Sequence, residues 1–561
     1  MQRHHVMREV IKFRPKDIRN ADTPRVGQLT STTLPAFLNR YRRITHKICR
    51  LTSSIERIVV ALALALYMAL LIYVIPRHEP WADEAQAWEL AKSLSLKSLF
   101  GTYIHYEGSP GLWHFLLWLL ARMHVTYGGM HWFTGAIAIA SAALLMLASP
   151  FPLPIRVLLP FTYFFAFQYA VIARSYVLFP LILLALACVW PTRRRHPFAL
   201  ALLLGLLANV SLHGLAVAVG LGVVLTIERY SIRKLEQEGL RMWLLCAGLF
   251  SAMVGFAVWC IAPARDAGWV VIAKQMPSVV SMSGMANHLW MRHVSLYLEI
   301  VISTMFRFVH VLDYGLAGRF YAGVVVWLLL LLRLKRQGML RYTLPVLSVA
   351  IPSMYTTFNF YHAGLLWVLF VFMWWVTWPN DELMLGNNQW METALLISVL
   401  LCIAPQLLWA SNAIRYDVSM PYSPSRDGAV ILESYLKRGY KVDVAVPSNV
   451  KFGGQGEFYI TDIEPYFAKE PIHNKVHRFW FWGSDDDMRA KYLVDAENHS
   501  AVIVVEEIAY DPRYLIEEKY LELLGYRRAE AVCGTVFYPV RDNGSACHVF
   551  YQPRNQQGRT P

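Results

Sequence analysis

The chain has 561 residues, of which 56% are hydrophobic and only 16% are charged. Water-soluble domains rarely show this balance, so the composition excludes an ordinary soluble enzyme or binding module and indicates a membrane protein. The net charge is +14, and nine of these charges lie in Met1–Arg57, where thirteen Lys or Arg stand against four Asp or Glu.

The basic segment 1–57 precedes the first apolar run. Basic residues before a span stay on the cytoplasmic side and attract anionic headgroups, so we expect a cytoplasmic segment that contacts membrane lipids. We expect no nucleic-acid partner, because no stacking motif or folded basic module follows. The apolar run from Ile58 begins too late and is too long for a cleavable signal peptide, so it should remain as the first span.

Apolar runs bounded by charge, Pro or Gly recur through residues 58–410, and each is a candidate span. The thirteen runs are Ile58–Ile75, Gly111–Ala121, Trp132–Ala148, Val157–Ile172, Val177–Trp190, Pro197–Leu212, Leu215–Ile227, Trp243–Ala262, Val294–Val311, Val324–Leu332, Leu344–Met354, Leu365–Val376 and Thr393–Leu408.

The positive-inside rule tests how many of these runs cross the membrane. The basic clusters Arg193–Arg195, Arg229–Arg241 and Arg333–Arg341 should all be cytoplasmic. If all thirteen runs crossed the membrane, the first two clusters would lie on the outer side, against this rule. The violation disappears if one run between Gly111 and Trp190 and one between Val294 and Leu332 do not cross. We therefore expect eleven to thirteen spans with the C-terminus outside.

From about Ser411 the composition changes to that of a water-soluble domain. Val442–Val446 and Ala501–Val505 are typical of buried strands, and Ile431–Arg438 is typical of a helix. We expect a soluble α/β domain over residues 411–561, outside the membrane. Of the seven cysteines, Cys533 and Cys547 flank two strand-like runs and could close a hairpin disulfide, which would require an oxidising compartment.

The first outer loop, residues 77–110, has the highest density of polar residues near a span. The stretch Glu84–Phe100 has near-helical apolar spacing and predicts a helix in the headgroup plane. Asp83-Glu84-Ala85-Gln86 matches a helix capping box with Asp83 as the cap. Adjacent carboxylates at a bilayer edge are costly unless solvated or used. A cap and a catalytic group therefore both remain open for Asp83.

Three short motifs resemble a known family of membrane enzymes. They are Trp81-Ala82-Asp83-Glu84, the run Glu107–His114 that enters the next helix, and Ala173-Arg174-Ser175-Tyr176. Over roughly Ile58–Ile227 the chain resembles the GT-C glycosyltransferase fold, and especially the bacterial dolichyl-phosphate-mannose-protein mannosyltransferase-like and RgtA/B/C/D-like proteins. The resemblance implies an inverting transfer of a sugar from a polyprenyl-phosphate donor to the hydroxyl of a glycan, lipid or protein.

The resemblance maps the family's loop acid onto Asp83, with Glu84 beside it. A carboxylate can take the proton that an acceptor hydroxyl loses as it attacks the anomeric carbon, so we expect Asp83 to be the general base. Asp83 and Glu84 are also the candidates if a divalent metal takes part. Many relatives carry a further acid in the second outer loop. Residues 168–178 contain none.

A fixed cation would stabilise the charge that develops on the leaving lipid phosphate. Arg174 fits this role, and Tyr176 could add a hydrogen bond. An arginine that merely reaches from a span end to the membrane surface is the alternative for Arg174. The remaining candidates for substrate binding are His105, Glu107 and His114, whose spacing matches no recognised metal-ligand pattern.

Two other classes of function compete with the glycosyltransferase. A transporter or flippase of a lipid-linked sugar would also need many spans, but it usually has charged or helix-breaking positions near mid-membrane, whereas the ionisable residues here cluster at span ends. A non-catalytic assembly or sensor protein would need only one or two spans. We expect the bacterial inner membrane, with the active site and the C-terminal domain facing the periplasm.

Overall fold

The computed structural model describes residues 54–230, 237–267, 316–355, 360–378, 389–444, 460–475, 477–480, 502–508, 513–534 and 546–554. Nearly all of the expected cytoplasmic segment 1–57 and the expected span Val294–Val311 lie outside the described residues.

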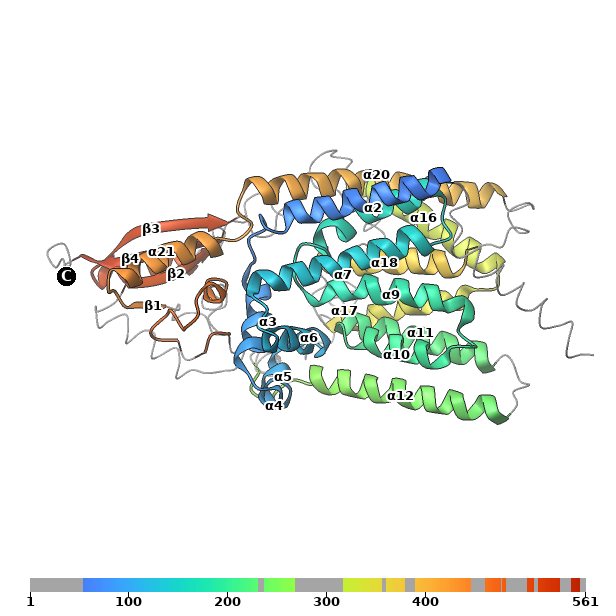
Figure 1. Ribbon diagram of the computed structural model, residues 1–561, viewed down its shortest axis with the longest axis horizontal. Coiled ribbons are helices and arrows are strands. Elements are labelled where there is room, and N and C mark those ends of the chain that lie inside the picture. The colour runs from blue at the N-terminus through green and yellow to red at the C-terminus, as the bar shows by residue number, and fades with distance from the viewer. Residues whose placement is uncertain are drawn as a thin grey trace, which may run out of the picture. The chain divides into compact units, whose positions relative to one another are not determined.

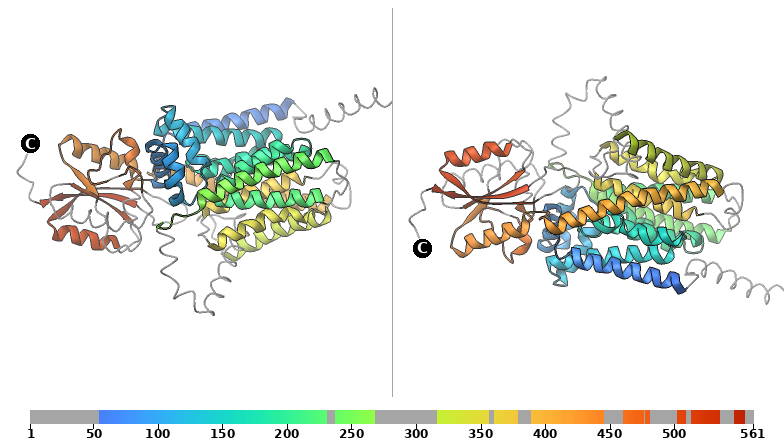
Figure 2. Two further views of the ribbon diagram at one scale, coloured as in Figure 1. Left: turned by 90° about the horizontal axis from the view of Figure 1, so that it is seen from below. Right: turned by 90° about the horizontal axis from the view of Figure 1, so that it is seen from above.

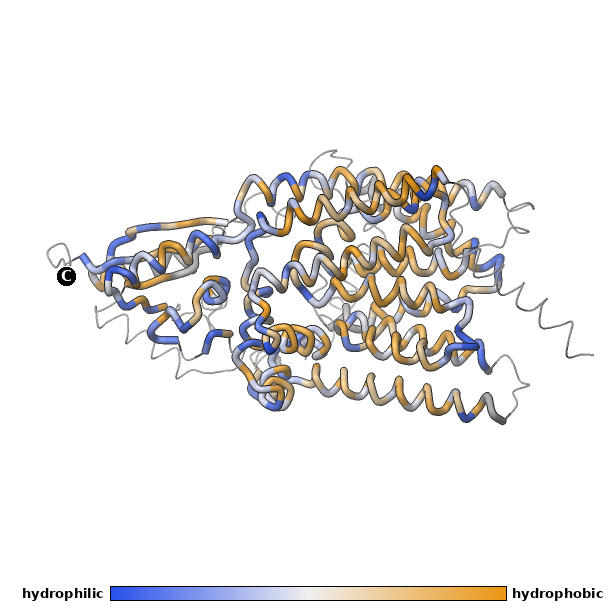
Figure 3. The backbone as a smooth tube through the Cα atoms, viewed as in Figure 1, coloured by the Kyte–Doolittle hydropathy of each residue, from blue (hydrophilic) through white to orange (hydrophobic). Residues whose placement is uncertain are grey.

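Six helical segments in this part of the chain are long and apolar enough to cross a membrane. They coincide with apolar runs expected from the sequence, and Figure 3 shows that they are hydrophobic over most of their length. The segments are α2 (Ser54–Val74), α7 (Tyr127–Ala148), Ser175–Thr192 with α9 (Leu178–Val189), α11 (Leu212–Tyr230), α12 (Gln237–Ile261) and α20 (Gln389–Ser419). The chain is thus a mostly helical protein of the membrane type. The expected eleven to thirteen spans stay a prediction.

Further helices pack among these six segments (Figure 1). They are α8 (Leu153–Leu158), α10 (Pro197–Ala208), α16 (Leu316–Arg336), α17 (Leu344–Tyr355) and α18 (Phe360–Val376). The expected span Val157–Ile172 is not a continuous helix, because α8 gives way to a 3₁₀ turn at Leu159–Phe161 and a π turn at Phe164–Gln168. Pro160 explains the break, since proline lacks the amide hydrogen that a helix interior requires.

The first outer loop folds into a compact set of short helices at one end of the long ones (Figure 1). Within residues 77–110 they are α3 (Ala82–Ser93), α4 (Leu96–Ser98), a π turn at Leu99–Tyr103 and α5 (Ile104–Glu107). The next helix, α6 (Leu112–Arg122), covers the expected span Gly111–Ala121 and packs against α3. Nine of the twelve residues of α3 are buried within the protein. The expected helix exists, but it is covered by protein on several sides rather than lying with one face in the headgroup plane.

Helix α21 (Ser425–Lys437) leads into a four-stranded sheet of order β1-β2-β4-β3. The strands are β1 (Val442–Val444), β2 (Val502–Ile508), β3 (Tyr526–Gly534) and β4 (Ala546–Pro553), with α24 (Arg513–Leu523) before β3. Among the described strands, β1 and β2 pair in parallel, and the other two pairs are antiparallel.

The two helices of this α/β region cover opposite faces of the sheet (Figure 2). Val502 and Val504 pack in one cluster with Leu432 of α21, whereas Ile503 packs in another with Leu521 of α24. Alternate residues of a strand point to opposite faces, which explains this division. The helix and strands expected near Ile431, Val442 and Ala501 are confirmed.

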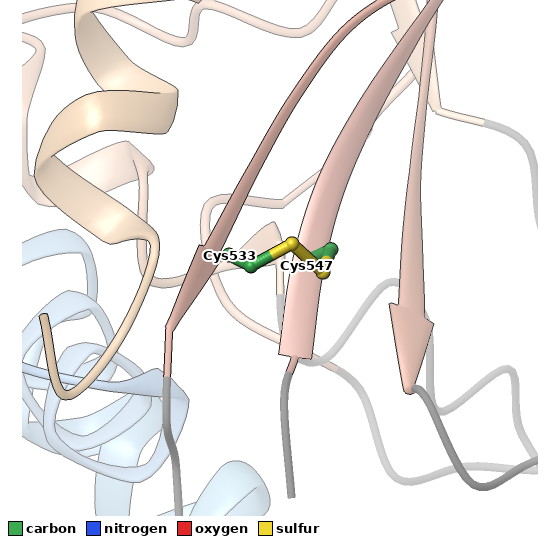
Figure 4. The surroundings of a disulfide bond; sticks show 2 residues. All are labelled: Cys533 and Cys547. Carbon is green, nitrogen blue, oxygen red and sulfur yellow. A yellow bond between two sulfur atoms is a disulfide. The ribbon is translucent and has the colours of Figure 1, made fainter. Parts of the chain in front are cut away.

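The expected disulfide is present: Cys533 on β3 faces Cys547 on β4 and the two are bonded (Figure 4).

Glu228 on α11 gathers basic side chains from two other segments. Arg193 Nε donates to Glu228 Oε2 at 2.9 Å, and Arg341 Nη2 lies 3.1 Å from Oε1. The three basic clusters used for the positive-inside test therefore meet at one end of the helices, which we call the basic end. Arg174 and Arg193 flank the helical span Ser175–Thr192. The two arginines thus lie at opposite ends of a segment roughly 27 Å long, and we call the end at Arg174 the site end.

Candidate functional site

Asp83 and Arg174 form an ion pair at the site end. Arg174 Nη1 lies 2.6 Å from Asp83 Oδ2, and each side chain is 23% exposed. Asp83 is the second residue of α3, and Arg174 stands in extended backbone just before the turn that begins the span Ser175–Thr192. Asp83 and Arg174, which belong to two sequence motifs in separate loops, thus bring opposite charges together at a partly exposed position.

The structure corrects the capping prediction. The cap position of α3 is Trp81 rather than Asp83, and the carboxylate of Glu84 accepts a hydrogen bond from the Trp81 amide at 3.1 Å. Gln86, expected to reach back to the cap, binds elsewhere. Asp83 therefore does not cap the helix. The guanidinium of Arg174 is paired with Asp83, and the alternative of an arginine that reaches the membrane surface stays open.

Two tyrosine rings flank the guanidinium of Arg174. Its Cζ lies 5.1 Å from the ring centroid of Tyr361 and 5.4 Å from that of Tyr176, which is within the range of a cation–π contact. The Tyr176 hydroxyl lies 2.8 Å from Nε2 of His362, whose ring is 4.4 Å from that of His213. These contacts restrict the guanidinium to few orientations.

Tyr361 and His362 lie in the first turn of α18 and His213 in the first turn of α11, whereas Tyr176 follows Arg174 at the start of the span that contains α9. Three helix N-termini therefore converge at the site end. Helix N-termini carry partial positive charge and unpaired amide donors, both of which favour an anion. Sequence reasoning missed Tyr361 and His362, although their place just before the apolar run Leu365–Val376 marks a helix entry.

Glu107 is the second carboxyl group of the site. Its Oε1 accepts a hydrogen bond from Gln86 Nε2 at 2.9 Å. Burial raises the pKa of Glu107 to about 7, and the charge of Asp83 adds to the increase, whereas the Gln86 hydrogen bond and Arg174 oppose it. Burial also raises the pKa of Asp83, against the charge of Arg174. Glu107 can therefore exchange a proton near neutral pH, and the pKa of Asp83 is shifted in the same direction.

Gln86 connects this site to the C-terminal region of the chain. Besides Glu107, its side chain donates to the carbonyl of Trp480 at 2.8 Å and accepts from the amide of Trp480 at 2.6 Å. One helical turn later, Glu89 pairs with Arg478 at 2.9 Å. Residues near 480 therefore fix the face of α3 that positions Glu107.

Glu84 is fully buried, and both of its carboxylate oxygens are occupied by protein. Oε1 accepts from the amide of Ala173 at 2.6 Å and lies 3.2 Å from His131 Nε2, while Oε2 lies 3.3 Å from His78 Nε2. Glu84 has no exposed oxygen for chemistry. Glu84 holds Ala173, and hence the backbone beside Arg174, against α3. Its expected share in catalysis stays a prediction.

The network around Glu84 extends to α20, since His78 Nδ1 lies 2.9 Å from Asp417 Oδ1. Burial opposes the charged form of His78, but the charges of Asp417 and Glu84 outweigh it and raise its pKa to about 10. For Glu84, burial acts to raise the pKa, but the two histidines outweigh it and hold the pKa well below the ordinary value. His78 and Glu84 are thus both charged at neutral pH.

The other two residues expected at the site form no hydrogen bond with Asp83, Arg174 or Glu107 among the described residues. His105 Nδ1 is 2.9 Å from the carbonyl oxygen of Ala262, and its ring packs on Trp259. It therefore ties α5 to the end of α12. His114 on α6 is buried, and its ring nitrogens have no hydrogen-bond partner among the described residues.

The residues described around Asp83 do not form a ready metal centre. In the ranges that the structure covers, no group of three or more His, Cys, Asp or Glu is arranged to hold a metal ion. The carboxylate of Asp83 is bound by Arg174, and that of Glu84 by His78 and His131. We derive no reaction step through a metal.

The chain was compared with family models, curated proteins and solved structures, and it matches none of them. The case for its function therefore rests on the geometry of the site and on the resemblance of its motifs.

Proposed function

We propose that the protein is an inverting glycosyltransferase that moves a sugar from a polyprenyl-phosphate donor to an acceptor hydroxyl at the outer face of the membrane. The observation that carries this proposal is the ion pair between Arg174 and Asp83, at 2.6 Å and partly open. A phosphate-binding cation and a proton-accepting carboxylate are the two groups that such a transfer needs, and they lie side by side.

Arg174 binds the donor phosphate. Its planar guanidinium can grip two phosphate oxygens, and the rings of Tyr176 and Tyr361 already fix its plane. The converging N-termini of the neighbouring helices add positive potential. As the bond between the anomeric carbon and the phosphate oxygen breaks, the phosphate keeps the electron pair, and Arg174 stabilises that charge.

Asp83 accepts the proton of the acceptor. The acceptor oxygen bonds to the anomeric carbon on the face opposite the departing phosphate, which inverts the configuration. The hydroxyl proton passes to the Asp83 carboxylate. One bond forms and one breaks at the anomeric carbon, so no covalent sugar–enzyme intermediate is needed.

The ion pair couples donor binding to the activation of the base. Without donor, the charge of Arg174 lowers the proton affinity of Asp83. The donor phosphodiester, which carries one negative charge, competes for the same guanidinium and weakens its hold on the carboxylate. Asp83 then becomes a stronger base at the moment when the donor is in place. Glu107, with a pKa of about 7, is the base if Asp83 proves dispensable.

We place the site end and the C-terminal domain on the periplasmic side of a bacterial inner membrane. The gathering of three basic clusters around Glu228 supports a cytoplasmic basic end. The disulfide between Cys533 and Cys547 supports an oxidising compartment for the sheet. Gln86 and Glu89 contact residues 478–480, which belong to the C-terminal region that contains the sheet. These contacts support a location of the C-terminal domain on the same side of the membrane as the site.

The test is transfer of labelled sugar in membranes that contain the full-length protein and a set of polyprenyl-phosphate donors. We expect Asp83→Asn and Arg174→Ala to lose at least about a hundredfold of the rate, the scale of a missing base or phosphate ligand. Asp427→Asn and Arg57→Ala, which change exposed residues of the same types, serve as matched controls and should stay near the wild-type rate.

Two outcomes would contradict the proposal. If wild-type protein transfers no sugar but vesicles that contain it translocate the lipid-linked sugar, the protein is a transporter or flippase. If transfer occurs and both variants retain it, the Asp83–Arg174 pair is a structural contact and the catalytic centre lies elsewhere.

A further inference from the structure

A groove runs between α10, α11 and α12 at the basic end, away from the Asp83–Arg174 site. Its cavity volume is about 360 Å³. The walls are mostly apolar and come from one face of each helix, with Leu200 and Leu204 on α10, Leu225 on α11, and Cys246 and Phe250 on α12. Residues spaced by three or four positions share a helix face, so the groove follows the helix axes for about 10 Å.

Small residues keep the groove open. Gly222 on α11 faces the ring of Phe250, and a β-carbon at Gly222 would come within 3.0 Å of that ring. Ala201 and Ala247 line the walls opposite. Larger side chains at these positions would fill the space between the helices.

Three arginines line the groove where it reaches the basic end: Arg193, Arg194 and Arg229. Arg193 is paired with Glu228, and Arg229 stacks over the Trp243 ring at 5.3 Å. The single carboxylate in the lining, Glu228, is also neutralised by Arg341. The mouth of the groove therefore carries a clear excess of positive charge above an apolar channel.

The geometry points to a binding site for an anionic glycerophospholipid of the basic-end leaflet, with an acyl chain between the helices and the phosphate at Arg194 and Arg229. Charge complementarity selects this occupant, because an apolar channel alone would accept any lipid chain, whereas the arginines add attraction only for a net negative headgroup. The site does not depend on the proposed sugar transfer and would tie α12 to the helices beside it.

The test measures lipid binding to purified, delipidated full-length protein in a nonionic detergent, by native mass spectrometry. The probes are phosphatidylglycerol and phosphatidylcholine with identical acyl chains. We expect phosphatidylglycerol to be retained in preference. Each arginine near a lipid surface adds about fivefold in affinity, so Arg194→Gln with Arg229→Gln should weaken binding by about thirtyfold.

Matched controls separate this site from general charge and packing effects. Arg195→Gln removes the same charge from the neighbouring position, which does not line the groove, and should leave the preference intact. Ala247→Phe fills the channel and should reduce retention of phosphatidylglycerol. Leu245→Phe changes a side chain that is 70% exposed and not part of the lining, and it should have no effect.

Three results would overturn the inference. Equal retention of the two lipids would remove the role of the arginines. Equal losses in Arg194→Gln and Arg195→Gln would show only general electrostatic attraction. Displacement of phosphatidylglycerol by an equimolar polyprenyl phosphate would assign the groove to a different lipid.

Discussion

Replacing Glu84 by glutamine tests whether this residue positions the site. Both oxygens of the buried carboxylate accept hydrogen bonds from backbone amides, those of Trp81 and Ala173. The side chain of glutamine has one acceptor oxygen and one NH₂ donor. One of the two backbone N–H groups, that of Trp81 or that of Ala173, would therefore face the NH₂ donor. The charged His78 would also lose one of its two carboxylate partners. Breaking a buried ionic contact of this kind costs about 3–5 kcal/mol in the free energy of unfolding.

The assay is denaturant titration of purified protein in detergent, together with sugar transfer in the same preparation. Glu433→Gln is the matched control, because Glu433 pairs with Lys437 at 2.9 Å but both side chains are more than half exposed. Such a surface pair contributes at most about 0.5 kcal/mol. The positioning role is refuted if Glu84→Gln lowers stability no more than this control and transfers sugar at the wild-type rate.

Three further predictions concern pH, the disulfide and the second carboxyl group. His78 has its pKa raised to about 10, so its contribution to stability is present below its ordinary value of 6.5 and is lost as pH rises through about 10. Unfolding titrations at pH 7 and pH 10 should show this loss in wild type and a smaller one in His78→Gln, and equal losses would contradict it. Cys533→Ser should destabilise the sheet by about 3 kcal/mol, the value for a disulfide that closes a loop of this length. Hydrogen exchange in β3 and β4 should then rise. Unchanged exchange would count against a structural role for the bond with Cys547. Glu107→Gln should flatten any change in transfer rate near pH 7 yet keep more than about a tenth of the rate, whereas a hundredfold loss would make Glu107 the base.

Local sequence patterns were sufficient to locate several elements of the fold. Continuous apolar runs mark the long helices because a lipid-facing helix needs apolar side chains on all sides. The continuous apolar run Val502–Val505 indicates a strand with both faces covered, and the positions of Cys533 and Cys547 on either side of a turn predict their bond. The break at Pro160 was missed because its neighbours are apolar enough to resemble a span.

The site was only partly visible in the sequence. The motifs at Asp83 and Arg174 could be recognised in isolation, and the charge of the loops placed both on one side of the membrane. The burial of Glu84 beside a partly exposed Asp83 could not be predicted, because it depends on whether α3 begins at Ala82 or two residues later. The contact of Gln86 with Trp480 joins segments that are distant in the chain and has no local signal.

The most direct test of the central claim is a comparison of steady-state constants for the purified wild type, Asp83→Asn and Arg174→Lys with a polyprenyl-phosphate sugar donor. If Asp83 is the base and Arg174 binds the phosphate, Asp83→Asn should lower kcat at least about a hundredfold with little change in the donor KM. Arg174→Lys keeps the positive charge but loses the bidentate contact with the donor phosphate, so it should raise the donor KM. A variant Asp83→Asn with wild-type kcat, or Arg174→Lys with an unchanged donor KM and kcat, would contradict the account.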